Sequence, residues 1–306
     1  MREPVLVSAD REVAALPAPA GESRLRRWLV GYGLLTPSVI AAIVFSFIPL
    51  GYIILVSFTR ESTFFLHQPD YTADNYREIW DRYMPHVYTT VRLATLSSLF
   101  DLVFGFPFAY ILVRKISYRG LVRTLMVFPL FGPLYLAFGL YYVLLPNGPL
   151  YPVLEFLNIK PTTLLYSEPM TVFGMALFTF PFMTMNVAAA LSNIDPMLEE
   201  AAQTLGANPL RVFEKILAPL AWPGILAGFL MCFGWNLGVY VVPILLGGTP
   251  QQRVLSLTLQ QKATVQFDYG LASAMGIVLL VMAFTVTWAS LRFSRGALGA
   301  RAAASA

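Results

Sequence analysis

Six long apolar runs constrain the fold of this chain more than any other feature of its sequence. They cover residues 29–57, 88–113, 121–145, 169–191, 224–246 and 269–291. A helix needs roughly 20 mostly apolar residues to cross the hydrocarbon core of a bilayer, and each run meets that length. Charged residues make up 12% of the chain, whereas soluble proteins carry about 25%. We therefore expect an all-α membrane protein with six transmembrane helices. Because six is even, both chain ends should lie on one side.

Basic residues are distributed unequally between the two sides of this topology. Fourteen of the 21 lysines and arginines fall on the side of the chain ends. Because Lys and Arg are enriched in cytoplasmic loops, this distribution predicts that both termini are cytoplasmic. Topology also accounts for the formal net charge of +4, so we expect membrane lipid around the chain and no nucleic-acid partner.

The sequence divides into one membrane domain and two tails. Residues 1–27 mix Ala, Pro and charged residues without a period, which is typical of a disordered tail. Residues 28–293 hold the six runs, and residues 294–306 form a second cytoplasmic tail. The first run is too long for a signal-peptide core and lacks a small-residue cleavage site, so we expect it to remain as a membrane helix.

Cysteine and histidine usage argues against disulfide and metal chemistry. The single cysteine, Cys232, lies inside an apolar run, and the two histidines, His67 and His86, lack neighbouring carboxylates or cysteines. We predict no metal site. Paired carboxylates, a histidine cluster and an activated nucleophile are also missing at membrane depth, so we predict no catalytic residue and no enzyme.

The polar segment 192–223, which we call the elbow, separates the fourth and fifth apolar runs. Asp195 followed by Pro196 is typical of a helix start, because an Asp side chain caps free backbone N–H groups and Pro suits the first turn. Gly206 is typical of a helix stop that needs a left-handed residue. A short helix is therefore expected between these signals.

A second start signal follows at once. Asn208 and Pro209 repeat the cap and first-turn pair, so the elbow is predicted as helix, sharp turn and helix. Pro219 and Pro223 lack the backbone N–H that a helix needs. We expect them to keep this second helix from running smoothly into the next apolar run.

Both elbow helices are expected to be amphipathic. On the first, one face carries Met197, Leu198, Ala201, Ala202 and Leu205. The opposite face carries Glu199, Glu200 and Gln203. Such a compact amphipathic segment suits docking into a cleft of another protein, and it would also suit lying on the bilayer surface.

The elbow carries a motif with regular spacing. Its residues are Glu200, Ala201, Ala202, Gly206, Ile216 and Pro219, with three residues before the glycine, nine before the isoleucine and two before the proline. This pattern resembles the EAA loop of binding-protein-dependent ABC importer permeases. One position departs from the family: Ala218 stands where leucine is usual before the proline, which reduces packing volume without changing the turn.

The resemblance covers about residues 29–293 and implies a type I ABC importer permease subunit in the bacterial cytoplasmic (inner) membrane. The implied partners are a cytoplasmic P-loop ATPase dimer, a second permease subunit, expected to be a different chain, and an extracytoplasmic solute-binding protein. The six motif residues would couple the permease to the ATPase. This chain has no phosphate-binding G-x-x-x-x-G-K-[ST] loop, so ATP and Mg would belong to the partner.

Two further stretches resemble a subgroup of this family. Residues 105–110 read GFPFAY and residues 241–248 read VVPILLGG, and both are similar to permeases of the spermidine/putrescine group. The resemblance implies a polyamine or a related small aminated solute. The pair Trp235 and Asn236 resembles sugar permeases instead, so a sugar or glycerophosphodiester importer is the alternative within this class.

Candidates for the solute path at membrane depth are Asp101, Tyr110, Trp235, Asn236 and Tyr240. An ionised carboxylate costs about 2.5–3.5 kcal/mol in the middle of a spanning helix, so Asp101 should face protein or water. It would either complement a cationic solute or hydrogen-bond a neighbouring helix. Trp235, Asn236 and Tyr240 would likewise either line the path or pack helices together, with Asn236 bonded across helices.

A proton-coupled secondary carrier is the alternative from another class. Such a carrier needs ionisable relays in its spanning helices and usually repeats its membrane segments. The sequence offers neither feature. Uptake that survives loss of ATP but not of the proton gradient would favour the carrier.

Overall fold

A computed structural model describes residues 24–59, 71–115, 120, 132–146, 148–157, 160, 164–247 and 253–304. Contacts divide the chain into two compact units, Met1–Tyr52 and Ile53–Ala306. Of the first unit, only the part of helix α1 up to Tyr52 is described. The second unit holds the remaining elements, and the sites below lie within it.

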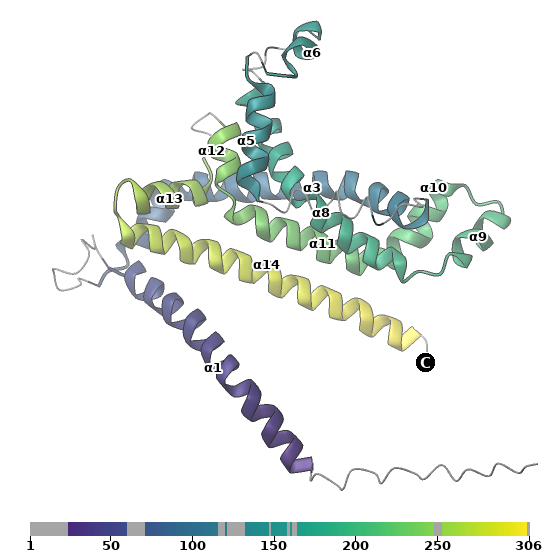
Figure 1. Cartoon of the computed structure of the whole chain (residues 1–306), viewed down its shortest axis with the longest axis horizontal. Helices are drawn as coiled ribbons and strands as arrows, with labels where there is room; N and C mark the ends of the chain where they lie inside the picture. The colour runs from purple at the N-terminus through teal and green to yellow at the C-terminus, as the bar shows by residue number, and fades with distance from the viewer. Residues whose placement is uncertain are drawn as a thin grey trace, which may run out of the picture. The chain divides into compact units, whose positions relative to one another are not determined.

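Figure 1 shows that the described chain is helical. The α-helices are α1 (Arg24–Ser57), α2 (Asp74–Glu78), α3 (Met84–Arg114), α5 (Pro133–Leu144), α6 (Tyr151–Phe156), α8 (Glu168–Ser192), α9 (Met197–Thr204), α10 (Pro209–Val212), α11 (Ala218–Gly238), α12 (Val241–Leu246), α13 (Leu255–Thr264) and α14 (Tyr269–Ala304). Two π-helical segments are η1 (Ile79–Tyr83) and η3 (Phe213–Leu217). Thr59 and Tyr71 form an isolated β-bridge.

In the described residues, five helical stretches are long and apolar enough to cross a membrane. They are Thr36–Ser57, Asp74–Arg114, Glu168–Ser192, Pro209–Gly238 and Tyr269–Ala289. They match the first, second, fourth, fifth and sixth apolar runs. Residues 121–131 of the third run lie outside the described residues, and its remainder forms α5, a shorter apolar helix. The all-α membrane class is confirmed, with five of the six expected spans described.

One expected span boundary was wrong. The run at 224–246 is not one helix, because α11 ends at Gly238, Val239 has extended backbone and α12 begins at Val241. Pro243 contributes to this break, since it has no N–H to continue the hydrogen bonding of α11. At the other end of the chain, α14 continues to Ala304, so the segment expected to be a cytoplasmic tail is helical up to that residue, and its side of the membrane stays a prediction. The alanine-rich sequence there has high helix propensity.

The elbow's second helix is not interrupted before the membrane. Helical structure continues from Pro209 to Gly238 as α10, η3 and α11, with Pro219 in the first turn of α11 and Pro223 inside it. The helix is therefore continuous, but it does not run smoothly, because it changes to π-helical geometry at η3. The π-helical segment η3 lies directly before Pro219, and its wider turn accommodates a residue that cannot donate a regular helical hydrogen bond.

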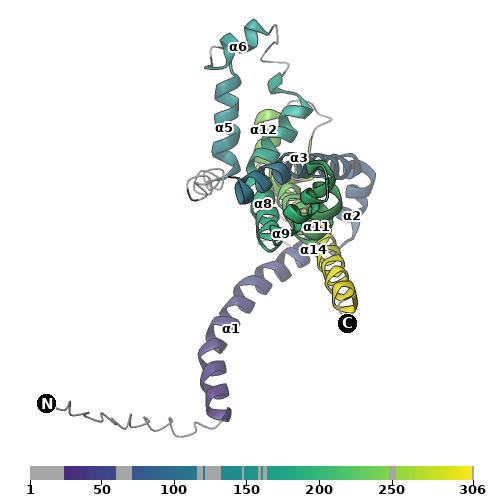
Figure 2. The ribbon, with the colours of Figure 1, turned by 90° about the vertical axis from the view of Figure 1, so that its right-hand side faces the viewer.

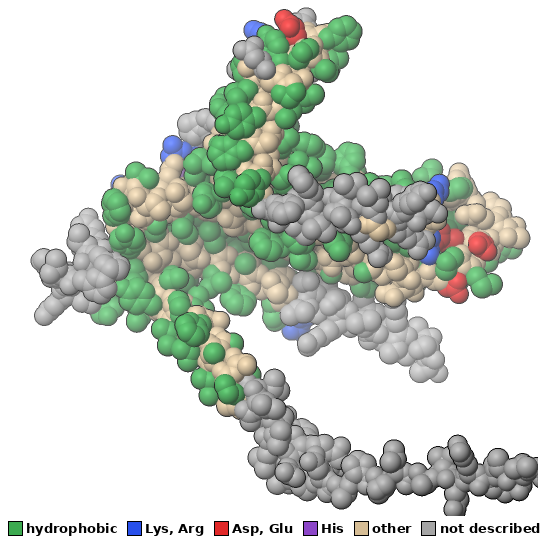
Figure 3. Space-filling model, in the orientation of Figure 1, with side chains coloured by type: hydrophobic (Ala, Val, Ile, Leu, Met, Phe, Trp, Pro, Cys, Tyr) green, Lys and Arg blue, Asp and Glu red, His purple; other side chains and the backbone are tan. Residues whose placement is uncertain are grey.

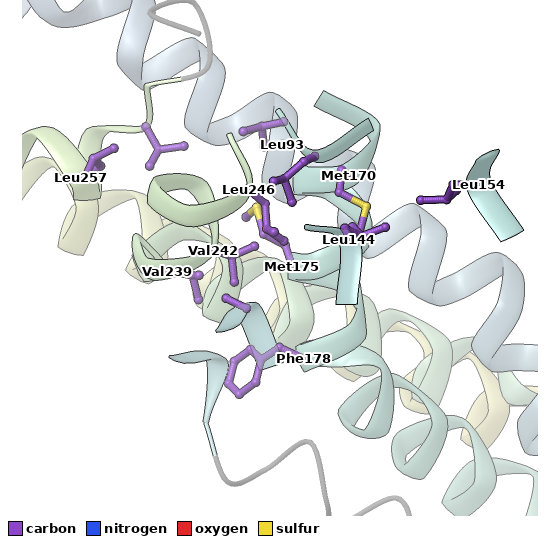
Figure 4. Packing of buried hydrophobic residues seen from close by; sticks show 13 residues of the cluster. Leu93, Leu144, Leu154, Met170, Met175, Phe178, Val239, Val242, Leu246 and Leu257 are labelled. Atoms are coloured by element: carbon purple, nitrogen blue, oxygen red, sulfur yellow. The ribbon is translucent and has the colours of Figure 1, made fainter. Parts of the chain in front are cut away.

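Helices α3, α8 and α11 form the centre of the second unit, and they lie side by side in both ribbon views (Figures 1 and 2). The approach of α8 and α11 depends on small residues, because a Cβ added at Gly224 would lie 2.3 Å from the Cβ of Ala190. Toward one end, α5 and α12 pack against α8 through a buried cluster that includes Leu144, Met175 and Leu246 (Figure 4). A second buried cluster joins α3, α8 and α11 to the elbow.

Large apolar side chains also cover much of the described surface (Figure 3). Phe45 on α1, Val103 on α3 and Phe284 on α14 are all exposed. Such a surface is costly in water but suits lipid or a second membrane chain.

Candidate functional site: the elbow and the intramembrane polar groups

The elbow begins with the predicted helix signals. The Asp195 carboxylate accepts a hydrogen bond from the backbone N–H of Met197 at 2.9 Å, at the start of α9. Gly206 has a φ of +83°, the left-handed conformation that glycine adopts most readily. The N–H of Ala207 bonds the carbonyl of Ala202 at 3.0 Å, which satisfies a free carbonyl at the helix end. The predicted stop at Gly206 is confirmed.

The second elbow helix also begins as predicted. The side chain of Asn208 accepts a hydrogen bond from the N–H of Leu210 at 3.3 Å, and Pro209 occupies the first turn of α10. The elbow is therefore a helix, a sharp turn at Gly206 and a second helix.

Residues of the EAA pattern occupy both sides of this turn. Glu200, Ala201, Gly206 and Pro219 are exposed, whereas Ala202 and Ile216 are half-buried. The exposed members lie where a second protein could contact them. Their role in coupling stays a prediction.

The apolar face of the elbow points away from the rest of the described chain. Leu205 is 89% exposed, and Met197, Leu198 and Leu210 are also exposed. Acidic side chains are visible at the same end of the molecule in Figure 3. An apolar face that the described residues leave uncovered is suited to a partner surface.

The predicted polar face of α9 is divided in the structure. Glu199 was expected to share a face with Glu200 and Gln203, which are exposed, yet Glu199 is only 6% exposed. Arg114, the last residue of α3, donates from Nε to Glu199 Oε1 at 2.8 Å, and the Tyr110 hydroxyl donates to Oε2 at 3.1 Å. The expectation was wrong because periodicity alone does not reveal a cation that makes burial of this carboxylate favourable.

A second contact joins the other arm of the elbow to the same helix. The ring of Phe213, at the start of η3, packs edge-on against Phe106 of α3 with centroids 4.6 Å apart. Leu217, at the end of η3, is buried in the same cluster as Ala109 and Val113 of α3. Both arms of the elbow therefore contact the last part of α3.

Asp101 lies deep between α3, α8 and α11, with 0% of its surface exposed. The Thr179 hydroxyl on α8 donates to Asp101 Oδ2 at 2.6 Å. The Asn236 amide on α11 donates to the same Thr179 oxygen at 3.2 Å. We call Asp101, Thr179 and Asn236 the central joint, because hydrogen bonds through them connect three helices.

The central joint is only partly satisfied. Asp101 Oδ1 and Asn236 Oδ1 are buried and have no hydrogen-bond partner among the described residues. Cys232 is also buried there, and its Sγ donates to the Thr179 carbonyl at 3.4 Å. In this structure Asp101 and Asn236 bond across helices, and their place in the solute path stays a prediction.

The five candidates for the solute path separate into three places. Asp101 and Asn236 lie in the central joint, and Tyr110 lies against the elbow. Trp235 and Tyr240 are exposed and line an open cavity of about 590 Å³. Phe178 also lines it, and Phe182 stacks on Trp235 with centroids 5.6 Å apart. The described lining is aromatic, aliphatic and small, without a charged side chain.

No group of three His, Cys, Asp or Glu side chains that could hold a metal ion occurs among the described residues. His86 Nδ1 lies 2.9 Å from the Thr258 hydroxyl, within hydrogen-bonding distance across two helices. His67 lies outside the described residues.

Comparison of the sequence with known proteins identifies related transport components. A family profile described as binding-protein-dependent transport system inner membrane component matches residues 101–298. The spermidine/putrescine transport system permease protein PotB of Escherichia coli K12 is 30% identical over 255 residues, covering 78% of this chain and 91% of that protein. The sulfate transport system permease protein CysT of Salmonella typhimurium is 33% identical over 218 residues, covering 69% and 77%.

Comparison of the structure gives similar folds at lower identity. A chain of a bacterial ABC transporter involved in the import of the acidic polysaccharide alginate aligns with a TM-score of 0.72 and 23% identity, covering 89% of this chain and 96% of that chain. A chain of the inward-facing MetNI methionine ABC transporter aligns with a TM-score of 0.52 and 18% identity, covering 69% and 94%. These likenesses concern the fold alone.

Proposed function

The chain belongs to the family of binding-protein-dependent transport system inner membrane components, and from this premise we propose that it is one of the two permease subunits of an ATP-driven importer. It is a multi-pass inner-membrane permease of a transport family and not an enzyme of its own. In the proposed transporter it lines the solute path, while a separate P-loop ATPase binds ATP and Mg. A second permease chain and an extracytoplasmic solute-binding protein complete the assembly, and both termini of this chain are cytoplasmic.

The observation that carries this proposal is the uncovered apolar face of the elbow. A short helix that exposes Leu205 and Met197 beside the exposed Glu200 suits a cleft in a partner protein. The sharp turn at Gly206 presents both elbow helices to one partner. Covering such side chains stabilises a complex by about 25 cal/mol for each Å² of apolar surface removed from water.

Co-purification tests this proposal most directly. We would tag the chain, extract it gently from its native membrane and identify the bound proteins. Recovery of a P-loop ATPase and a second permease chain is expected. Recovery of the ATPase alone would indicate two copies of this chain, and a well-folded sample without ATPase would contradict the proposal.

Replacement of Gly206 tests the elbow itself. A side chain at a φ of +83° is strained, and the left-handed conformation costs about 1–2 kcal/mol for a residue other than glycine. In Gly206→Val we expect the turn to shift, so that ATP hydrolysis no longer drives uptake in proteoliposomes. Gly139→Val is the matched control, because a Cβ there meets no atom within 4 Å and its φ is ordinary. Normal uptake by Gly206→Val would count against the coupling role.

For the solute, we propose a polyamine or a related aminated cation. The relatives named for spermidine and putrescine align over 78% of this chain, and the aromatic cavity beside Trp235 and Tyr240 offers ring faces to an ammonium group. A sulfate ion would gain most from cationic donors, and the described lining of this cavity has no Lys or Arg.

Uptake by the reconstituted transporter would separate the solutes. We expect spermidine or putrescine to be taken up, and sulfate, a sugar and a glycerophosphodiester to be excluded. Trp235→Leu should weaken polyamine uptake severalfold, because a cation–π contact is worth about 0.5–2 kcal/mol. Trp288→Leu is the control, since Trp288 is exposed and is not among the residues lining this cavity. Uptake that depends on a proton gradient and not on ATP would instead support a secondary carrier.

A further inference from the structure

The last two turns of α3 bind the elbow through one carboxylate. Tyr110 and Arg114 are four residues apart on α3, so their side chains project from the same face. Tyr110 bonds one oxygen of Glu199 at 3.1 Å and Arg114 bonds the other at 2.8 Å. The second arm of the Arg114 guanidinium donates to the Ile194 carbonyl at 2.8 Å, in the turn that leads into α9.

We infer that Arg114 and Tyr110 are positioning residues that fasten the elbow to α3 through Glu199, so that the elbow and the adjoining end of α3 move as one body during transport. This inference rests on the proposed function and extends it to residues outside the EAA pattern. We call these three residues the latch.

The composition of the latch makes it stiffer than an ordinary surface ion pair. Glu199 and Arg114 have side chains that are 8% and 15% exposed, so water competes weakly for them. Hydrogen bonds to charged groups in such surroundings are shorter and stronger than neutral ones. Because both carboxylate oxygens are bonded, rotation of Glu199 would break two contacts at once.

The second arm of the elbow contacts α3 independently of the latch. Phe213 packs on Phe106, and Leu217 is buried against the same end of α3. The two arms thus hold α3 at Phe106 and at Tyr110–Arg114, on either side of Pro107. A displacement of the elbow therefore acts on this end of α3 at two separate points.

Helix α3 continues from the latch to the centre of the unit. Asp101 lies on the same helix, nine residues before Tyr110, and it bonds Thr179 of α8 in the central joint. Thr179 in turn accepts from Asn236 of α11. A contiguous set of packed and hydrogen-bonded groups therefore leads from the elbow to all three central helices.

The adjacent glutamates of α9 have different environments. Glu200 is exposed and remains available to a partner protein, whereas Glu199 points inward to the latch. One turn of helix can thus contact the partner and α3 together, which is the arrangement that a transmitting element requires.

Amide hydrogen exchange of the purified full-length chain tests the latch without any partner. In Arg114→Ala we expect residues 197–204 to exchange about tenfold faster or more, since charged hydrogen bonds that hold α9 in place are lost. The control is Lys115→Ala, which removes the same charge at the next, exposed position. Unchanged exchange in Arg114→Ala would overturn the inference.

Covalent rescue tests the latch in the assembled transporter. The double variant Arg114→Cys with Glu199→Cys should hydrolyse ATP with uptake reduced about tenfold. A short bifunctional thiol reagent should restore uptake, because it fastens the same two positions. Native Cys232 is buried and would not compete. A cross-linked transporter that retains its ATPase but does not take up solute would show that these positions must separate, which contradicts the inference.

The two experiments distinguish the latch from the proposed function. If the wild-type chain binds no ATPase, the proposed function fails, and the exchange experiment still decides whether Arg114 holds the elbow. If the ATPase binds and drives uptake but Arg114→Ala changes neither exchange nor coupling, the latch fails alone.

Discussion

Two buried carboxylates in this protein have very different surroundings. Glu199 in the latch has hydrogen bonds to both oxygens, and one donor is the cation of Arg114. Asp101 in the central joint accepts from the neutral hydroxyl of Thr179, and its other oxygen has no partner among the described residues. The first carboxylate is held by charge and the second by hydrogen bonding between helices.

The location of each group explains the difference. Glu199 lies in the elbow helix α9, beside the end of the spanning helix α3, where Arg114 can keep part of its surface in water while pairing with the carboxylate. Asp101 lies inside the helix, where a charged partner would also have to leave water at a high free-energy cost. The comparison teaches that of two buried carboxylates, one can be stabilised by an ion pair and the other by hydrogen bonds from neutral groups.

The largest expected effect on this comparison comes from Glu199→Ala. The variant removes the carboxylate that binds Arg114 and Tyr110, so we expect the free energy of local opening of α9 to fall by about 1.5–3 kcal/mol. Hydrogen exchange of residues 197–204 measures it. Glu200→Ala is the matched control, because Glu200 is the exposed neighbour on the same helix. An equal effect of the two variants would remove the distinction between them.

Neutral replacement of both carboxylates should sharpen the comparison. Glu199→Gln keeps the shape but loses the ion pair, and we expect about 1–2 kcal/mol less stability of the elbow. Asp101→Asn keeps an oxygen that accepts from Thr179, and interhelical hydrogen bonds of this kind are worth about 0.6 kcal/mol on average. We therefore expect less than about 1 kcal/mol for Asp101→Asn in unfolding from detergent. A larger loss there than in Glu199→Gln would show that the charge of Asp101 matters.

The smallest effect is expected at Arg92 and Glu168. These residues pair between α3 and the start of α8, but the Arg92 side chain is 49% exposed. Exposed ion pairs contribute about 0–1 kcal/mol, so Arg92→Ala should change the midpoint of thermal unfolding little. Thermal unfolding of Glu199→Ala is measured alongside. If Arg92→Ala lowers the unfolding midpoint as much as Glu199→Ala does, the greater exposure of the Arg92–Glu168 pair does not make it weaker than the Arg114–Glu199 pair.

Local features of the elbow could be predicted from the sequence because their causes are local. Asp195 and Asn208 cap helices through backbone groups two residues away, and Gly206 adopts its left-handed conformation at one position. The apolar runs likewise identified five described spans by length and composition.

Features that depend on distant partners could not be predicted in this way. Glu199 faces inward because of Arg114, 85 residues earlier in the chain, and Asp101 meets Thr179 from 78 residues away. Tyr110 was expected in the solute path, and in the structure its hydroxyl bonds Glu199 of the elbow, 89 residues later in the chain. The charge of Arg114 had been counted toward topology, although an arginine at a helix end is also a potential partner for a carboxylate.

The π-helical segment η3, which joins the elbow to α11, has a consequence for how this sequence can change. Each residue of an α-helix turns the chain by about 100°, so a one-residue insertion normally rotates every side chain beyond it onto a new face. A wider turn absorbs such an insertion locally. Because of the segment Phe213–Leu217, the directions in which elbow side chains face can change without changing the directions in which the side chains of α11 face. If the elbow binds an ATPase as proposed, mutation can adapt it to a different partner surface while α11 keeps its own orientation.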